Sequence, residues 1–306
     1  MKIIVSGSLA YDRIMDFPGY FSDHIIAEKA HTLNVSFQVD GVKERFGGTA
    51  GNIAYALTLM GEQPLVCATI GHDYHKYYEW LAKTGISTED IRIIEDELTA
   101  SAYITTDRAD NQITGFNPGA MKHRTSLDFD EFNPKETIVI VSPGNLEDML
   151  SYPLLCKARG IDYIFDPGQS LPMLDAGGLT HAIEGCRILI SNDYELELIV
   201  RKTGLTKEAL SKLAGTVIVT KGEHGSMVST PNGEMSIPAA KPKKVLDPTG
   251  AGDAYRGGLI GGLVRGKGIE ESARMGSACA SFAVECYGTQ DYRFSPEEFN
   301  ERLSSC

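Results

Sequence analysis

Short apolar runs alternate along most of this chain with longer segments of helical periodicity, and this alternation constrains the fold more than any other feature. We expect strands at residues 2–9, 64–70, 137–142, 162–166, 187–191 and 216–221. We expect helices between them, near residues 49–60, 73–84, 145–159, 178–185 and 193–203. Strands that alternate with helices predict βαβ units and a mostly parallel sheet covered on both faces.

In the C-terminal third, strands and helices no longer alternate one by one. Two short strands near 225–230 and 234–237 are followed by helices near 252–266, 269–285 and 295–304. A chain of 306 residues is long enough for one large domain or for one domain with a small appendage. We therefore predict a single α/β domain over residues 1–306.

Two regions, at about residues 11–46 and 100–118, break the alternation. The second is typical of a hairpin, with a strand from Ala102 to Thr105, a polar turn, and a return strand from Ile113 to Phe116. Neither region makes a core alone, so we expect them to pair into one small β-sheet that projects as a lid. The exposed edge or face of such a sheet could also be a dimer contact.

Charge and composition exclude several classes of function. The formal net charge is −12, which disfavours a nucleic-acid partner because such binding needs a basic face. No apolar run approaches a membrane span, so we expect no membrane partner. The six cysteines are scattered, which favours a reducing, cytoplasmic location with free thiols. Any phosphate ligand has to be held by local devices, such as glycine loops and helix N-termini.

One such device is the stretch Asp247-Pro-Thr-Gly-Ala-Gly-Asp253, at the predicted start of a helix. Glycines there let a phosphate approach the free backbone N–H groups of a helix N-terminus. Asp253 could then take a proton from a hydroxyl group that attacks the phosphorus. The simpler interpretation is that Asp253 only favours a helix start, but a helix cap does not require the constrained residues before it. Gly257 and Gly258 are expected to serve close helix packing.

Two further glycine-led or strand-end segments carry polar residues. Phe46-Gly-Gly-Thr-Ala-Gly-Asn52 opens a helix, and Asn52 is either a local cap or a partner for substrate hydroxyls. Asp12 follows the first strand, and ligands of parallel sheets bind beyond the carboxyl ends of strands. Asp12 is also an ordinary turn residue.

Three more strand ends carry weaker signals. Asn192 to Glu195 opens a helix, where an acidic residue usually complements the helix dipole. Thr220 to Gly225 resembles a loop over phosphates but also an ordinary turn. Asp166 to Gln169 is a further polar turn. A P-loop motif, a dinucleotide fingerprint and a histidine spacing suited to zinc are all absent from the sequence.

Together these motifs resemble those of the ribokinase (phosphofructokinase-B-type) family of carbohydrate kinases. The Gly-Gly segment before Asn52, the Asn192 to Glu195 motif, the Thr220 to Gly225 loop and the Asp247 to Asp253 stretch occur in the family's order. The resemblance covers nearly the whole chain and implies a ribokinase-like three-layer sandwich with a small β-sheet lid.

Within the family, four stretches are similar to those of bacterial adenosine kinases. They are GSLAYDRIMDFPGYFSDHI (7–25), QITGFNPGAM (112–121), DPTGAGDAYRGG (247–258) and YGTQ (287–290). Sugar kinases of the family usually place Asn two residues before Asp12, where this chain has Ala10. Pro248 also replaces the more common Thr.

The resemblance implies a role for each site residue. Asp253 would be the general base, and the N–H groups of Gly250, Ala251 and Gly252 would form the anion hole. Nucleoside contacts would come from Ser8, Asp12, Ser36, Gly48, Asn52, Tyr103, Phe116 and Gln169. Of these, Tyr103 and Phe116 would face each other across the lid and sandwich the adenine, unless they are only lid packing. ATP contacts would come from Asn192, Thr220, Lys221, Gly222, Gly225 and Gly252.

The resemblance also implies ATP and Mg²⁺, with Glu195 holding Mg²⁺ through water. Asp247 and Thr249 would contribute to a K⁺ site. The expected reaction is transfer of phosphate from ATP to the 5′-hydroxyl of adenosine, giving AMP and ADP, in a possible homodimer formed through the lid sheet. Two alternatives stay open: a kinase of another nucleoside or of a free sugar, and a non-catalytic nucleoside or nucleotide sensor.

Overall fold

The computed structural model describes residues 1–25 and 35–305, and a large central sheet dominates it. Within these residues the sheet has nine strands in the order β13-β12-β11-β10-β9-β8-β1-β4-β5. Their bounds are β1 (Lys2–Ser6), β4 (Pro64–Gly71), β5 (Ile91–Ile94), β8 (Thr137–Val141), β9 (Asp162–Phe165), β10 (Ile188–Asn192), β11 (Val217–Thr220), β12 (Ser226–Thr230) and β13 (Gly233–Ile237). Pairing is parallel from β5 to β11, and only β12 and β13 are antiparallel.

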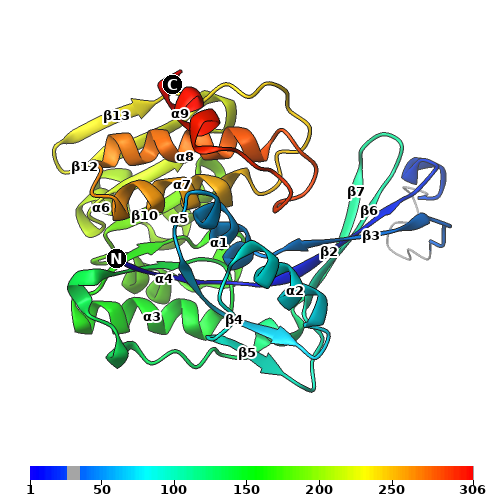
Figure 1. The fold of residues 1–306 in the computed structure, drawn as a ribbon, viewed down its shortest axis with the longest axis horizontal. Helices are drawn as coiled ribbons and strands as arrows, with labels where there is room; N and C mark the ends of the chain where they lie inside the picture. Colours follow the sequence, from blue (N-terminus) through cyan, green and yellow to red (C-terminus); the bar gives the residue numbers. More distant parts are fainter. Residues whose placement is uncertain (26–34, 306) are drawn as a thin grey trace.

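Helices cover both faces of this sheet (Figure 1). They are α1 (Thr49–Leu59), α2 (His75–Thr84), α3 (Leu146–Arg159), α4 (Ala176–Ile183), α5 (Asp193–Thr203), α6 (Lys207–Leu213), α7 (Ala251–Val264), α8 (Ile269–Ala283) and α9 (Pro296–Ser304). One buried cluster joins the sheet to α1, α2, α7, α8 and α9, and a second joins it to α3, α4, α5 and α6. The expected three-layer architecture is confirmed.

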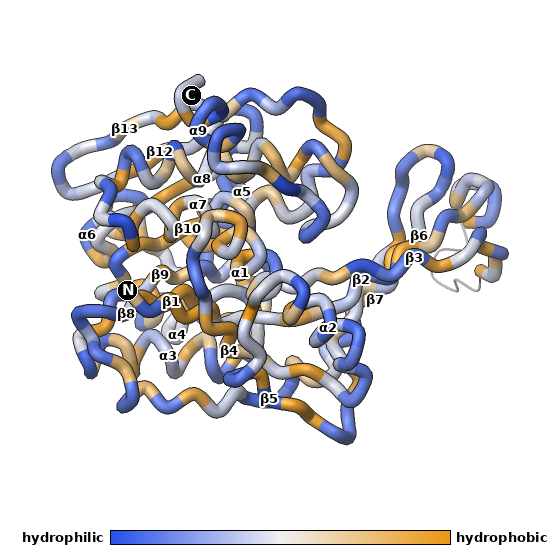
Figure 2. The backbone as a smooth tube through the Cα atoms, viewed as in Figure 1, coloured by the Kyte–Doolittle hydropathy of each residue, from blue (hydrophilic) through white to orange (hydrophobic). Residues whose placement is uncertain are grey.

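Strand β8 illustrates why the chain forms this sandwich. Ile138 and Ile140 belong to the first cluster, whereas Val139 and Val141 belong to the second. Successive side chains of a strand point to opposite faces, so a continuous apolar run buries residues in both layers. Figure 2 shows the same pattern, with hydrophobic colour in the central strands and hydrophilic colour in the outer loops.

The expected strands and helices are recovered, with β5 and α6 in addition, and most boundaries agree within two residues. Strand β5 and helix α6 were not predicted, because both are too short to show a clear period. The first strand ends at Ser6 and not at residue 9. A Cβ on Gly7 would come within 2.3 Å of the Ser142 hydroxyl, so the chain at this point packs closely against the end of β8.

The two irregular regions pair into one small sheet, as expected. It contains β2 (Ala10–Asp16), β3 (Asp40–Gly47), β6 (Ala100–Thr106) and β7 (Gln112–Asn117), in the order β3-β2-β6-β7. Residues 26–34 of the first region lie outside the described residues. The sheet projects from the sandwich at the side where β1 ends and β2 begins (Figure 1). We call these four strands the lid.

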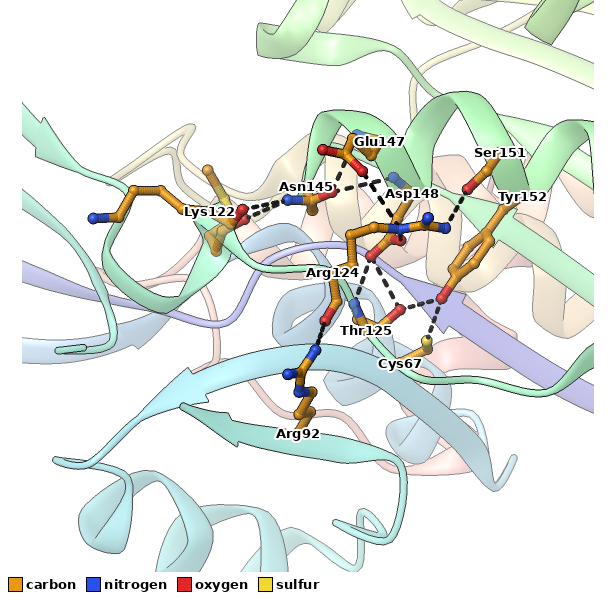
Figure 3. A network of polar contacts seen from close by, with 11 residues as sticks. Cys67, Arg92, Lys122, Arg124, Thr125, Asn145, Glu147, Asp148, Ser151 and Tyr152 are labelled. Carbon is orange, nitrogen blue, oxygen red and sulfur yellow. Dashed lines mark hydrogen bonds and ion pairs between the residues drawn. The ribbon is translucent and has the colours of Figure 1, made fainter. Parts of the chain in front are cut away.

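A buried carboxylate fastens the chain after β7 to helix α3 (Figure 3). Asp148 is 2% exposed and accepts hydrogen bonds from Arg124 Nε at 3.0 Å and from the backbone N–H and hydroxyl of Thr125 at 2.8 and 3.0 Å. Asn145 caps α3 through the N–H groups of residues 147 and 148, and its side-chain amide donates to the carbonyl of residue 122 at 2.8 Å. These bonds fix where the lid hairpin rejoins the body.

We expect Asp148→Ala to lower the free energy of unfolding by about 2 kcal/mol, because it removes a buried acceptor and leaves the part-buried donors of Thr125 without their partner. The matched control is Glu147→Ala, whose side chain is 75% exposed and lies 3.9 Å from Arg124. Such an exposed ion pair contributes less than about 0.5 kcal/mol. Urea titration of both variants measures the difference, and equal losses would contradict this role for Asp148.

Candidate active site

The start of helix α7 brings the glycine stretch and Asp253 to the carboxyl edge of the sheet. Gly250 is the N-cap with a φ of 77°, a conformation that favours glycine. A Cβ on Gly250 would lie 2.8 Å from the side chain of Thr289, and one on Gly252 would lie 3.0 Å from Arg256 Nη1. Both positions therefore lack side chains for steric reasons.

The first N–H groups of α7 are the donors that a helix leaves without an intrahelical partner. Ala251 is an exception within the predicted anion hole, because its N–H donates to the Pro248 carbonyl at 3.2 Å. Gly252 lines a cavity of about 330 Å³ together with Gly250 and Asp253. The glycines later in the helix have the expected packing role, since a Cβ on Gly257 would lie 2.4 Å from that of Ala56.

Asp253 lies in the first turn of α7, in the wall of this cavity. Burial raises the pKa of Asp253 to about 6, and the nearby carboxylates of Asp166 and Asp12 act in the same direction. Arg256 and the hydrogen bond from Asn52 oppose the increase. A carboxylate with such a pKa is still ionised at neutral pH and is a stronger base than an exposed one.

Arg256 is a cavity residue that the sequence analysis missed. Its guanidinium forms a buried bidentate ion pair with Asp166, in which Nη2 donates at 2.7 Å and Nε makes a second, shorter contact. Its Nη1 donates to the carbonyl of Gly252 at 3.0 Å. The guanidinium of Arg256, held by Asp166, lies beside Asp253 and lowers its pKa, and its bond to Gly252 braces the first turn of α7. The sequence could have indicated Arg256 as a site residue, because it follows Asp253 by three residues and so lies on the same side of the predicted helix.

Asn52 is not a local cap. It is 5% exposed within α1, whose N-cap is Gly48, and its Nδ2 donates to Asp253 Oδ2 at 2.8 Å. Thr289 Oγ1 and Gln290 Nε2 contact its Oδ1 at 2.8 and 2.9 Å. The structure thus joins Asn52 to Asp253 across 201 residues of sequence.

Asp12 lies at the base of the lid, in β2. Burial is the main cause that raises the pKa of Asp12 to about 6, Asp247 adds to it, and Arg45 opposes it. A Cβ on Gly47 would lie 2.5 Å from Asp12 Oδ2, and one on Gly48, which has a φ of 87°, would lie 2.5 Å from the Ser8 carbonyl. These two glycines therefore allow α1 to begin close beside Asp12.

Ser8 and Ser36 differ from their expected positions. The Ser8 hydroxyl is buried and accepts a hydrogen bond from the N–H of Thr49 at 3.1 Å, so it supports the start of α1. Ser36 is exposed and precedes β3 at the end of that strand remote from Gly47. Because β3 runs for eight residues and each residue advances about 3.3 Å, the structure does not bring Ser36 to the base of the lid.

The predicted sandwich between Tyr103 and Phe116 is wrong. Strand pairing sets Phe116 opposite Ala102 and Tyr103 opposite Gly115, so the two aromatic side chains point to opposite faces of the lid. Asp12 pairs with Ala102, which puts Phe116 on the same face as Asp12. Phe116 is 52% exposed there.

Tyr103 belongs to the other face of the lid. Arg13 Nη1 donates to its hydroxyl at 2.8 Å, and the guanidinium carbon of Arg13 lies 5.3 Å from the ring centroid. Tyr103 therefore helps to organise the outer face of the lid. The sequence indicated the hairpin, but a difference of one residue in register decides which face each aromatic residue occupies.

The predicted ATP residues border two adjoining cavities. Thr220, Gly222 and Gly252 line both the cavity beside Asp253 and a larger, mostly apolar one of about 680 Å³. Gly225 lines the larger cavity; its φ is 79°, and a Cβ on it would lie 2.0 Å from the Ile237 carbonyl oxygen, so there is no room for a side chain. Lys221 is exposed and lines neither cavity.

Three other predicted residues line the smaller cavity. Asn192 and Glu195 form a capping box at the start of α5 and also line the cavity. The N–H of Glu195 donates to Asn192 Oδ1 at 2.7 Å, and the N–H of Asn192 donates to Glu195 Oε2 at 2.8 Å, so both side chains do help to start the helix. Burial raises the pKa of Glu195. Gln169, predicted to contact the nucleoside, lines this cavity together with Asp166.

Asp247 and Thr249, predicted to bind K⁺, share a turn. Asp247 accepts hydrogen bonds from the N–H groups of Thr249 at 2.9 Å and Gly288 at 3.3 Å. Among the described residues, no group of three or more His, Cys, Asp or Glu side chains is arranged to hold a metal ion.

Comparisons with known proteins agree with this geometry. The model of the pfkB family of carbohydrate kinases matches residues 10–295. The chain belongs to this family. A nucleoside kinase of Methanocaldococcus jannaschii is 34% identical over 99% of this chain and 96% of its own length. The structure of that organism's nucleoside kinase has a TM-score of 0.86, with 31% identity over 100% of this chain and 99% of the relative.

The structure of Burkholderia thailandensis nucleoside kinase in complex with inosine is also similar. It has a TM-score of 0.85 and is 36% identical, over 99% of this chain and 97% of that protein. The same protein has been solved in complex with ADP-inosine. Family membership makes this chain a kinase, an ATP-dependent phosphotransferase. Separately, no helix among the residues that the structure describes is long and apolar enough to cross a membrane.

For this pfkB-family kinase we expect Asp253→Asn to increase stability at neutral pH. The folded pKa of Asp253, about 6, is above the ordinary 3.8, so its ionised form destabilises the fold as pH rises from about 4 through 6. The variant should gain about 2 kcal/mol at pH 8 and nothing below pH 4. Thermal unfolding across pH measures this, with exposed Glu89→Gln as control. A gain in stability that did not depend on pH would contradict the raised pKa of Asp253.

Proposed function

We propose that this protein is a nucleoside kinase that transfers the terminal phosphoryl group of ATP to the ribose 5′-hydroxyl, with adenosine among its substrates. The observation that carries the proposal is the position of Asp253. This carboxylate of raised pKa is in the wall of a cavity whose other borders include the N-terminus of α7, the buried Arg256 and the strand end at Thr220 and Gly222. That combination supplies a base, an anion site and a positive charge at one point.

In the proposed reaction, Asp253 accepts the proton of the 5′-hydroxyl as its oxygen attacks the phosphorus. The Gly252 N–H and the dipole of α7 stabilise negative charge on the transferred group. Gly250 contributes to the same anion site. Ala251, whose N–H bonds the Pro248 carbonyl, contributes only as the first residue of α7, whose dipole acts at the site. The guanidinium of Arg256, positioned by Asp166, favours the ionised form of Asp253.

The acceptor nucleoside would lie between the lid and α1. The carboxylate of Asp12, the second N–H of the Asn52 amide and the backbone at Gly48 suit the 2′- and 3′-hydroxyls of a ribose. Phe116 offers an exposed aromatic face on the same side of the lid as Asp12, where a purine could stack. The names of the Burkholderia and Methanocaldococcus relatives support a nucleoside acceptor, and the complex of the former with inosine supports a purine.

ATP would occupy the two cavities bordered by Thr220, Gly222 and Gly225, with its base in the larger and its phosphates toward Gly252. Mg²⁺ would neutralise phosphate charge when bound. Since the described residues offer no cluster of metal ligands, we propose that the ion is held mainly by ATP and by water on Glu195. The K⁺ site at Asp247 and Thr249 and the homodimer through the lid stay predictions.

A substrate panel with Mg-ATP tests the function. We expect phosphorylation of adenosine, and of inosine or guanosine beside it, to exceed that of ribose and fructose. Asp253→Asn should lower kcat about 10³-fold, since it removes the base, and should keep nucleoside binding. Faster turnover of a free sugar would instead favour the sugar-kinase alternative. Unchanged turnover in Asp253→Asn would contradict the role of the base.

The two lid aromatics provide a matched pair for base recognition. Phe116→Ala is expected to raise KM for a nucleoside about tenfold, because it removes a stacking surface on the face of Asp12. Tyr103→Ala removes an aromatic ring from the opposite face and should change KM little. Steady-state kinetics with both variants distinguishes the faces, and the reverse ranking would contradict the proposed position of the nucleoside.

A further inference from the structure

We propose that Gln290 is a positioning residue, and that a chain of hydrogen bonds from Trp80 through Gln290 and Asn52 fixes which atom of the Asn52 amide faces Asp253. The inference rests on the proposed function, because it concerns the base of that reaction. Gln290 is 2% exposed and lies in the stretch YGTQ, to which neither the mechanism nor the ATP site assigns a role.

The chain begins at the single tryptophan of the protein. Trp80 Nε1 donates to Gln290 Oε1 at 2.8 Å. An indole N–H can only donate, so the atom it contacts must be the oxygen of the Gln290 amide. The nitrogen of that amide therefore points the other way, toward Asn52 and Tyr77.

The second fixed point is a backbone carbonyl. Tyr77 is fully buried, and its hydroxyl donates to the carbonyl of Gly47 at 2.7 Å. A carbonyl can only accept, so the same hydroxyl is left to accept from Gln290 Nε2 at 3.0 Å. Both ends thus require the same orientation of the Gln290 amide.

The last link decides the orientation of Asn52. Gln290 Nε2 donates to Asn52 Oδ1 at 2.9 Å, and Asn52 Nδ2 then donates to Asp253 Oδ2 at 2.8 Å. In the flipped orientation, Asn52 would turn a carbonyl oxygen toward a carboxylate and an amide nitrogen toward an amide nitrogen. Thr289 cannot make this choice, because its hydroxyl could donate to either Asn52 Oδ1 or the Phe46 carbonyl.

The consequence is that Asp253 always faces the N–H donor of Asn52 and never its carbonyl oxygen. A hydrogen bond to the ionised form of a carboxylate favours that form. Asp253 is also faced by the charges of Arg256, Asp166 and Asp12 and by the hydroxyl of Tyr292. None of these groups belongs to the chain of hydrogen bonds from Trp80. Breaking the chain is therefore expected to move the titration of Asp253 and leave its other neighbours in place.

Two neutral substitutions break the chain at different distances from the base. Gln290→Met removes the donor to Asn52 and adds no charge, and Trp80→Phe removes the indole N–H. We expect the acid limb of the kcat/KM profile to move upward by about one pH unit in Gln290→Met and by about half a unit in Trp80→Phe. The matched control is Tyr55→Phe, which removes a hydroxyl that bonds the Tyr292 carbonyl in the same aromatic cluster. Its profile should stay in place.

A measurement without substrate separates this inference from the proposed function. The melting temperature is recorded across pH for wild type and Gln290→Met, each with and without Asp253→Asn. The pH at which the difference reaches half its plateau reports the titration of Asp253 alone, and it should be higher in the Gln290→Met background.

An unchanged midpoint, or activity lost equally at every pH, would overturn the inference and leave Gln290 as a packing residue. If wild type phosphorylates no nucleoside, the proposed function fails, and the unfolding measurement still decides the role of Gln290.

Discussion

The site depends on keeping one carboxylate ionised where water is scarce. Burial opposes the charge of Asp253, and two further carboxylates, Asp12 and Asp166, increase the opposition. The first turn of α7, the guanidinium of Arg256 and the amide of Asn52 act against it. The resulting pKa of about 6 lies near neutrality, where a base is both ionised and able to accept a proton. The glycines, the buried ion pair and the start of α1 all serve this balance.

The same balance explains how an acidic protein can handle phosphate. With a net charge of −12, attraction at long range is not available. The chain instead concentrates short-range donors at one edge of the sheet. Gly250 and Gly252 have no side chains because Thr289 and Arg256 occupy the space. Each glycine in the motif thus has a neighbour that explains it, and the open backbone results from packing as well as from function.

The sequence predicted the layers well and the details of the site unevenly. Apolar runs buried on both faces identify strands such as β8, and the glycine stretch located Asp253. Sequence spacing could not reveal that Phe116 and Tyr103 occupy opposite faces of the lid, because one residue of register reverses a side chain.

Long-range pairs were equally hidden in the sequence. Arg256 and Asp166 are 90 residues apart, and Gln290 and Asn52 are 238 apart. Nothing local in the sequence indicates that these residues are partners. Only the arrangement of strand ends at one edge of the sheet brings them together.

The residues of the site are divided between the sandwich and the lid. Asp253, Arg256, Asn52 and Gln290 all lie on the sandwich, whereas Asp12 and Phe116 lie on the lid. The hydrogen bond from Asn52 and the charge of Arg256 therefore reach Asp253 from the sandwich, whereas the charge of Asp12 reaches it from the lid. The chain of hydrogen bonds meets the lid where the Tyr77 hydroxyl donates to the carbonyl of Gly47, the last residue of β3. Asp12 lies against this same residue, since a Cβ on Gly47 would lie 2.5 Å from Asp12 Oδ2. The junction of lid and sandwich therefore places the lid carboxylate and the amide donor of Asn52 near the same group, Asp253.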